Sequence, residues 1–145
     1  MKVLIINGPN LNMLGIRQPE VYGYETYFDL VRYCHTQAEI LDIDLVCFQS
    51  NHEGEIIDKI QDAYKKFDGI IINAGAYTHY SIAIMDALKS VNIPSIEVHL
   101  SDIYQRESYR HVSYIKEACI KSIVGLGFEG YKIALETLKQ FILEN

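Results

Sequence analysis

Short apolar runs and longer amphipathic stretches alternate along the whole chain. The short runs are rich in Val and Ile and nearly continuous, as in Gly-Ile-Ile-Ile at 69–72, which is typical of strands buried on both faces of a parallel sheet. The predicted strands are Lys2 to Ile6, Leu45 to Gln49, Gly69 to Asn73, Ser95 to His99 and one near Lys121 to Val124.

The stretches between these runs repeat their apolar positions every three or four residues, which predicts helices. They are expected over Thr26 to Leu41, Glu53 to Phe67, Ser81 to Val91 and Tyr131 to Leu143. The buried stripe predicted for the first helix is Phe28, Val31, Cys34, Ala38 and Leu41. Because strands and helices alternate to the end, the pattern predicts an α/β fold: a flavodoxin-like, doubly wound, five-stranded parallel sheet with helices on both faces.

Composition limits the classes of protein to which the chain can belong. A chain of 145 residues that is 49% apolar is expected to form one domain over residues 1–145 with its own core. Its formal charge of -6, with no basic run, argues against a nucleic-acid partner. The first apolar run, Val3 to Ile6, is too short for a signal peptide or a membrane span, so we expect no membrane association and a cytoplasmic location. Cys34, Cys47 and Cys119 lie far apart and are expected to be reduced core residues.

The connections after three strands are the expected place for a ligand. In doubly wound sheets, ligands bind beyond the carboxyl ends of the strands, and here residues 7–24, 73–80 and 97–110 follow strands one, three and four. The first connection runs about 18 residues where 2–6 are usual, which indicates a lid or binding loop. It carries Asn10, Arg17 and Tyr22. The alternative is a surface loop in which Tyr22 only packs against the body.

The end of the fourth strand carries the strongest local signal for chemistry. Side chains alternate along a strand, so Glu97 and His99 share one side, where the carboxylate can fix the imidazole tautomer and raise its basicity. A purely structural ion pair remains the alternative. A metal site would need His79 or Asp102 as further ligands, but the spacing matches no metal-binding motif, so no metal is expected.

Hydrogen-bonding and cationic groups lie on both sides of that pair. Ser101, Arg106 and Arg110 follow the fourth strand, and guanidinium groups with a hydroxyl suit an anionic, hydroxylated substrate. Asn73 and His79 flank the third strand and can add hydrogen bonds. The alternative for the arginines is solvated surface charge.

The sequence does not support a cofactor. Gly-Leu-Gly-Phe-Glu-Gly at 125–130 spells a dinucleotide fingerprint, but no acidic strand follows it, so we interpret it as a turn into the last helix. A flavin phosphate would need hydroxyls that residues 7–16 lack, and a phosphoacceptor domain would need carboxylates where Asn7 and Asn73 stand.

Several motifs, kept in order along the chain, resemble those of the type II 3-dehydroquinate dehydratases. They are Asn7-Gly-Pro-Asn-Leu-Asn-Met-Leu-Gly15, Arg17-Gln-Pro-Glu-Val-Tyr-Gly23, Gln49-Ser-Asn-His-Glu-Gly54, Gly75-Ala-Tyr-Thr-His79, Ile96-Glu-Val-His-Leu-Ser101, and Gly125-Leu-Gly127 followed by Gly130-Tyr131. The resemblance implies conversion of 3-dehydroquinate to 3-dehydroshikimate by anti elimination of water through an enolate, in the shikimate or quinate pathway and without a cofactor.

The same resemblance implies a role for each matching residue. Tyr22 would take the C2 proton and His99 would protonate the departing C1 hydroxyl, with Glu97 orienting His99. Two arginines would lower the pKa of Tyr22 by stabilising its phenolate, and an asparagine would hold a water beside the enolate; these are Arg17, Arg106 and Asn10. The substrate contacts would be Asn73, His79, Leu100, Ser101 and Arg110.

The resemblance also implies an assembly of trimers grouped into a dodecamer, with Asp86 reaching a neighbouring subunit's site. Two positions depart from the family's common residues: Ala74 replaces a proline, and Asp102 replaces an asparagine beside the anion-binding turn. Two other functions stay open at this stage. One is a non-catalytic module that binds a small polyhydroxy acid, and the other is metal-assisted hydrolysis through Glu97 and His99.

Overall fold

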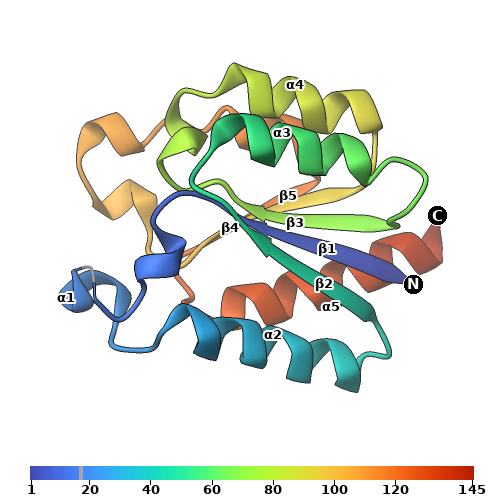
Figure 1. Ribbon diagram of the computed structural model, residues 1–145, viewed down its shortest axis with the longest axis horizontal. Coiled ribbons are helices and arrows are strands. Elements are labelled where there is room, and N and C mark those ends of the chain that lie inside the picture. Colours follow the sequence, from blue (N-terminus) through green and yellow to red (C-terminus); the bar gives the residue numbers. More distant parts are fainter. Residues whose placement is uncertain (17) are drawn as a thin grey trace.

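A single parallel sheet organises the molecule. The computed structural model describes residues 1–16 and 18–145, apart from the side chains of Val21 and Tyr22. The strands are β1 (Lys2–Asn7), β2 (Asp44–Gln49), β3 (Gly69–Asn73), β4 (Ser95–His99) and β5 (Lys121–Val124), in the order β2-β1-β3-β4-β5 (Figure 1). This order confirms the predicted flavodoxin-like, doubly wound sheet.

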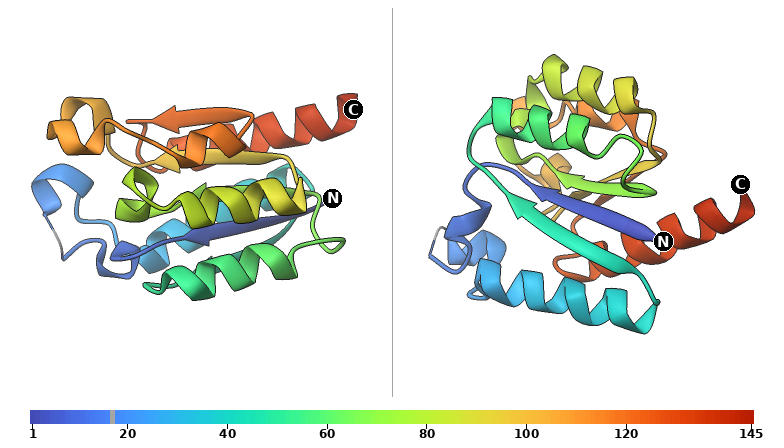
Figure 2. Two further views of the ribbon diagram at one scale, coloured as in Figure 1. Left: turned by 90° about the horizontal axis from the view of Figure 1, so that it is seen from above. Right: turned by 45° about the vertical axis from the view of Figure 1, so that its right-hand side comes forward.

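Two helices cover each face of the sheet. In Figures 1 and 2, α2 (Tyr27–Ile40) and α5 (Glu129–Glu144) lie on one side, and α3 (Glu53–Asp62) and α4 (Ile82–Val91) lie on the other. Alternation along β1 sends Val3 and Ile5 into the first core and Leu4 and Ile6 into the second, and all four are fully buried. This inner strand is therefore apolar on both faces, as its continuous run predicts.

The start of α2 is fixed by its own side chains. Thr26 Oγ1 accepts from the Asp29 amide at 3.2 Å, and the Asp29 carboxylate accepts from the Thr26 amide at 2.9 Å, which forms a capping box. The predicted buried stripe is wrong at Phe28, which is 69% exposed. Cys34 and Ala38 are buried as predicted, and Leu30 is buried in place of Phe28, because Leu30 lies about 200° around the helix from Phe28.

Other differences from the predicted elements lie at their ends. The helix predicted to reach Phe67 ends at Asp62, and Lys65 takes a left-handed conformation with φ 62° in the turn that follows. The last helix begins at Glu129, two residues before the predicted start. The connections between the elements also contain short helical turns too brief for periodicity to detect: α1 (Pro19–Tyr22) and 3₁₀ turns at Leu11–Met13, Gly75–His79, Ile103–Gln105, Ser108–Arg110 and Ile115–Ala118.

The cysteines are all free thiols. Cys34 is buried as predicted, whereas Cys47 and Cys119 are only partly buried. Burial raises the pKa of both partly buried thiols to about 12, so they are protonated and poorly nucleophilic. None of the helices in the described part of the chain is long and apolar enough to cross a membrane.

Candidate active site

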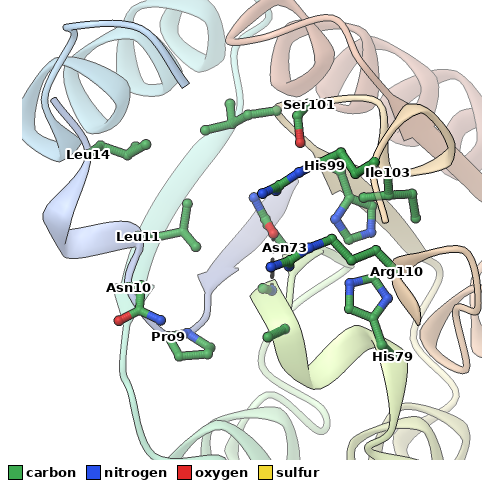
Figure 3. Close-up of a pocket in the computed structure, with 14 residues that line it drawn as sticks. Pro9, Asn10, Leu11, Leu14, Asn73, His79, His99, Ser101, Ile103 and Arg110 are labelled. Carbon is green, nitrogen blue, oxygen red and sulfur yellow. Dashed lines mark hydrogen bonds between the residues drawn. The ribbon is translucent and has the colours of Figure 1, made fainter. Parts of the chain in front are cut away.

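A pocket opens at the carboxyl edge of the sheet, where the connections after β1, β3 and β4 meet. Figure 3 shows the first connection on one side of the pocket, and His79, His99 and Arg110 on the other. The lining residues are Pro9, Asn10, Leu11, Leu14, Asn73, Gly75, Ala76, His79, His99, Leu100, Ser101, Ile103, Arg106 and Arg110. The strand-end rule therefore places the pocket correctly.

The first connection is held in place from β2. Asn10 has a left-handed backbone, with φ 69°, and its amide donates to Asn51 Oδ1 at 3.0 Å. Gln49 Nε2 donates to the same oxygen at 3.1 Å and to the Gly8 carbonyl at 3.2 Å. These bonds compensate an unfavourable backbone conformation, and they fix where Asn10 enters the pocket.

Asn73 stands on a buried chain of polar groups. Its Nδ2 donates to the Tyr131 hydroxyl at 3.2 Å, and that hydroxyl donates to Asn7 Oδ1 at 2.6 Å. Asn73 Oδ1 accepts from the Gly75 amide at 3.1 Å. Asn7 and Asn73 are register partners in β1 and β3. Tyr131, which is fully buried in α5, therefore helps to fix the amide that lines the pocket.

Glu97 and His99 form a buried pair at the end of β4. His99 Nε2 donates to Glu97 Oε1 at 2.7 Å, and the two residues are 5% and 0% exposed. This contact is the one that strand alternation predicts. Because Nε2 is engaged by the carboxylate, Nδ1 is the ring nitrogen left for a ligand in the pocket.

The carboxyl group of Glu97 is held in its ionised form. Burial alone would raise its pKa, but hydrogen bonds from His99, Ser113 and Ser122, together with the attraction of the imidazole, hold the pKa below its usual range. Glu97 is therefore a fixed, charged acceptor for the imidazole of His99.

His79 presents an acceptor to the pocket. Its Nδ1 donates to the Val112 carbonyl at 2.8 Å, and burial lowers its pKa. The ring is therefore neutral near pH 7, and Nε2 carries a lone pair that can accept from a ligand hydroxyl.

Two arginines supply the positive charge. Arg110 Nε donates to Glu107 Oε2 at 2.8 Å, which fixes the guanidinium against the pocket wall. Arg106 Nη2 donates to Gln18 Oε1 at 3.4 Å, so it reaches the connection that carries α1. The arginines come from two successive turns rather than from one helix face, yet both line the pocket.

The other predicted site residues are not among the described residues that line the pocket. Arg17 and the side chain of Tyr22 lie outside the described part of the structure. Asp86 is exposed on α4 and is not among the lining residues. Asp102 does not line the pocket either, because its carboxylate accepts from the Tyr104 amide at 2.9 Å and caps a 3₁₀ turn.

The structure also bears on the sequence motifs for a dinucleotide cofactor and for a metal. The glycine-rich stretch at 125–130 forms a turn, with φ 80° at Gly125 and 56° at Gly127, and α5 begins within it at Glu129. Among the described residues, no three His, Cys, Asp or Glu side chains come together as metal ligands.

The fold and the pocket together define a class of protein. A buried Glu–His pair, amides and guanidinium groups at the carboxyl edge of a parallel sheet are typical of α/β enzymes that act on small anionic molecules. Comparison with known proteins places the chain within that class. The family model described as class II dehydroquinase matches residues 1–139, and the chain belongs to this family.

Relatives of known name match nearly the whole chain. A "3-dehydroquinate dehydratase" of Clostridium perfringens is 55% identical over 143 residues, covering 98% of both chains, and one of Caldicellulosiruptor bescii is 56% identical over 142 residues, covering 97% of this chain and 98% of the relative. The crystal structure of a type II dehydroquinase from Butyrivibrio crossotus superposes with a TM-score of 0.94 at 53% identity, covering 96% of this chain and 97% of the other.

Proposed function

We propose that this chain is a dehydratase that converts 3-dehydroquinate to 3-dehydroshikimate and water by anti elimination through an enolate. The observation that carries the proposal is the buried Glu97–His99 pair, which keeps Nε2 on the carboxylate at 2.7 Å and leaves Nδ1 for a ligand of the pocket that His99 lines. The family and the names of its members support the same reaction. Three unpaired cysteines suit an enzyme of the cytoplasm.

The leaving group departs with a proton from His99. In the proposed elimination, the enolate electrons form the C1–C2 double bond and restore the carbonyl as the C1–O bond breaks. Nδ1–H of the imidazolium protonates the departing C1 hydroxyl, which leaves as water. Glu97 acts through His99, because its carboxylate stabilises the imidazolium and holds the ring in one orientation.

The base in the proposal is Tyr22, which takes the C2 proton while the C2–H electron pair forms the enolate. Arg17 and Arg106 stabilise the phenolate, and Asn10 holds a water beside the developing enolate oxygen. The bond between Arg106 and Gln18 supports this arrangement, because it ties a pocket cation to the turn from which α1 and Tyr22 follow.

The remaining lining groups match a hydroxylated carboxylate. Arg110, the Ser101 hydroxyl and the backbone amides of Leu100 and Ser101 offer donors, and His79 Nε2 offers an acceptor. Asn73, fixed by Tyr131 and Gly75, offers its second amide proton. The set binds polar groups on several sides of a small ring, which favours one orientation of the substrate.

An ultraviolet assay tests the function directly. The product contains a carbonyl conjugated with a carbon–carbon double bond, so its formation from 3-dehydroquinate should raise the absorbance, and a chelator should leave the rate unchanged. Binding without turnover would instead indicate a non-catalytic module, and loss of activity with chelator would indicate metal-assisted chemistry.

Asp86 is proposed to act in a neighbouring subunit of a dodecamer built from trimers. Its exposure on α4, away from its own pocket, supports that role. Dilution to the monomer should therefore lower specific activity, and Asp86→Asn should lower activity while preserving the fold. Light scattering measured alongside the assay checks both, and a fully active monomer would contradict the proposal.

A further inference from the structure

Ser122 meets Glu97 across the sheet, although no motif singles it out. Glu97 in β4 and Ser122 in β5 are register partners, so their side chains project from the same face of the sheet. Ser122 Oγ donates to Glu97 Oε2 at 2.6 Å. This bond occupies the carboxylate oxygen that His99 leaves open, since His99 binds Oε1.

Ser113 completes the set from a different part of the chain. It is 4% exposed, and its Oγ donates to Glu97 Oε1 at 2.5 Å. Ser113 Oγ in turn accepts from the Lys116 amide at 3.1 Å. Because the amide occupies an acceptor site on the hydroxyl, the hydroxyl proton is directed at Glu97. The carboxylate thus receives donors on both oxygens from three segments of the chain.

We infer that Ser113 and Ser122 are positioning residues of the active site: together they fix the orientation and the charge of Glu97, and through it the imidazole of His99. The inference deepens the proposed function, since it rests on His99 acting as the acid. Neither serine lines the pocket, so neither is a catalytic residue.

The need for these donors follows from where Glu97 lies. A fully buried carboxylate is unstable in its charged form unless donors replace water. Among the residues that the structure describes, the titratable side chains that interact with Glu97 are His99, Cys119 and His79. Cys119 holds its proton tightly and His79 is neutral, so the hydrogen bonds that stabilise the charge come from His99 and the two hydroxyls. With one hydroxyl lost, the charged form of the carboxylate is less stable. The carboxylate also loses a hydrogen bond that restrains its rotation.

Ser122 is the better position for a test. Ser113 also caps the turn that contains Lys116, so its loss disturbs the backbone. Ser122 is exposed on an edge strand, and within the described structure its bond to Glu97 is the one side-chain hydrogen bond it makes. Ser122→Val and Ser122→Thr form a matched pair, because the two side chains have nearly the same shape and both favour strands, but only threonine has a hydroxyl.

The first measurement is a carbon-13 NMR titration of Glu97 in the free protein, which needs no turnover. Removing a hydrogen bond to the charged form should raise the pH of half-titration by about one unit in Ser122→Val relative to wild type. Ser122→Thr should stay close to wild type. Equal midpoints in the valine and threonine variants would overturn the inference, whatever reaction the protein catalyses.

The second measurement separates kcat from KM with 3-dehydroquinate. Ser122→Val should lower kcat by about 3- to 30-fold, because misplacement of a catalytic group by a fraction of an ångström is enough for such a loss. KM should stay within about twofold, since Ser122 does not touch the pocket, and threonine should restore kcat. A loss shared by both variants would show a structural role instead. Absence of turnover in the wild type would contradict the proposed function and leave the titration as the test.

Discussion

His99→Gln is expected to lower kcat by about 10²- to 10⁴-fold, which is the usual range for loss of a general acid. Glutamine can still donate an amide proton to Glu97, so the buried carboxylate keeps a partner and the strand end should keep its conformation. It cannot supply a proton to the departing hydroxyl. Because the other pocket groups are unchanged, KM should change only a few-fold.

Steady-state kinetics across pH and a thermal unfolding curve check this expectation. His35→Gln is the matched control, because His35 is exposed on α2, outside the pocket lining. The control should keep wild-type kinetics. A His99→Gln enzyme that retained more than a tenth of wild-type kcat would remove His99 as the acid.

Tyr22→Phe is expected to abolish detectable turnover without unfolding the protein. Phenylalanine keeps the ring but lacks the oxygen that takes the C2 proton, so no enolate forms. Tyr24→Phe is the control, since Tyr24 is in the same connection and is 81% exposed. The control should retain activity, and wild-type rates in Tyr22→Phe would exclude Tyr22 as the base.

Exchange of the substrate's C2 proton with solvent distinguishes loss of the acid in His99→Gln from loss of the base in Tyr22→Phe. If the enolate forms reversibly before water leaves, His99→Gln should still exchange the C2 proton of 3-dehydroquinate with deuterium from solvent, while releasing little product. Tyr22→Phe should do neither. Nuclear magnetic resonance of the substrate in heavy water measures both processes, and exchange in Tyr22→Phe above the enzyme-free rate would assign proton removal to another group.

The sheet and its helices could be predicted because buried parallel strands and amphipathic helices leave strong periodic signals. Phe28 shows where that signal fails. Phe28 and Leu30 are both apolar and lie on different sides of the helix, and tertiary packing buries Leu30 rather than Phe28. The early end of α3 depends on the left-handed turn at Lys65, and lysine carries no local signal for such a conformation. Helix ends are in general weakly encoded.

For the site, the strand-end rule and the pairing of Glu97 with His99 could be read from the sequence. The residues that hold those groups could not. Tyr131 bonds to Asn7 across 124 positions of sequence, and Ser122 meets Glu97 only because of the register between β4 and β5. Alternation says which face of a strand a side chain occupies, but not which residue of the next strand lies beside it.

The bond from Tyr131 to Asn7 also bears on the point during synthesis at which the pocket floor can form. The polar groups under the pocket floor come from β1, β3 and α5, so Asn7 and Asn73 cannot form their bonds to the Tyr131 phenol until residue 131 has been synthesised. Before that point Asn7 Nδ2 can donate to the Tyr27 hydroxyl, at 3.4 Å. Since synthesis proceeds from the amino terminus at about 5–20 residues per second, the pocket is the last part of the sheet edge to be completed. We therefore expect a nascent chain to lack the complete pocket floor until α5 has emerged from the ribosome and docked.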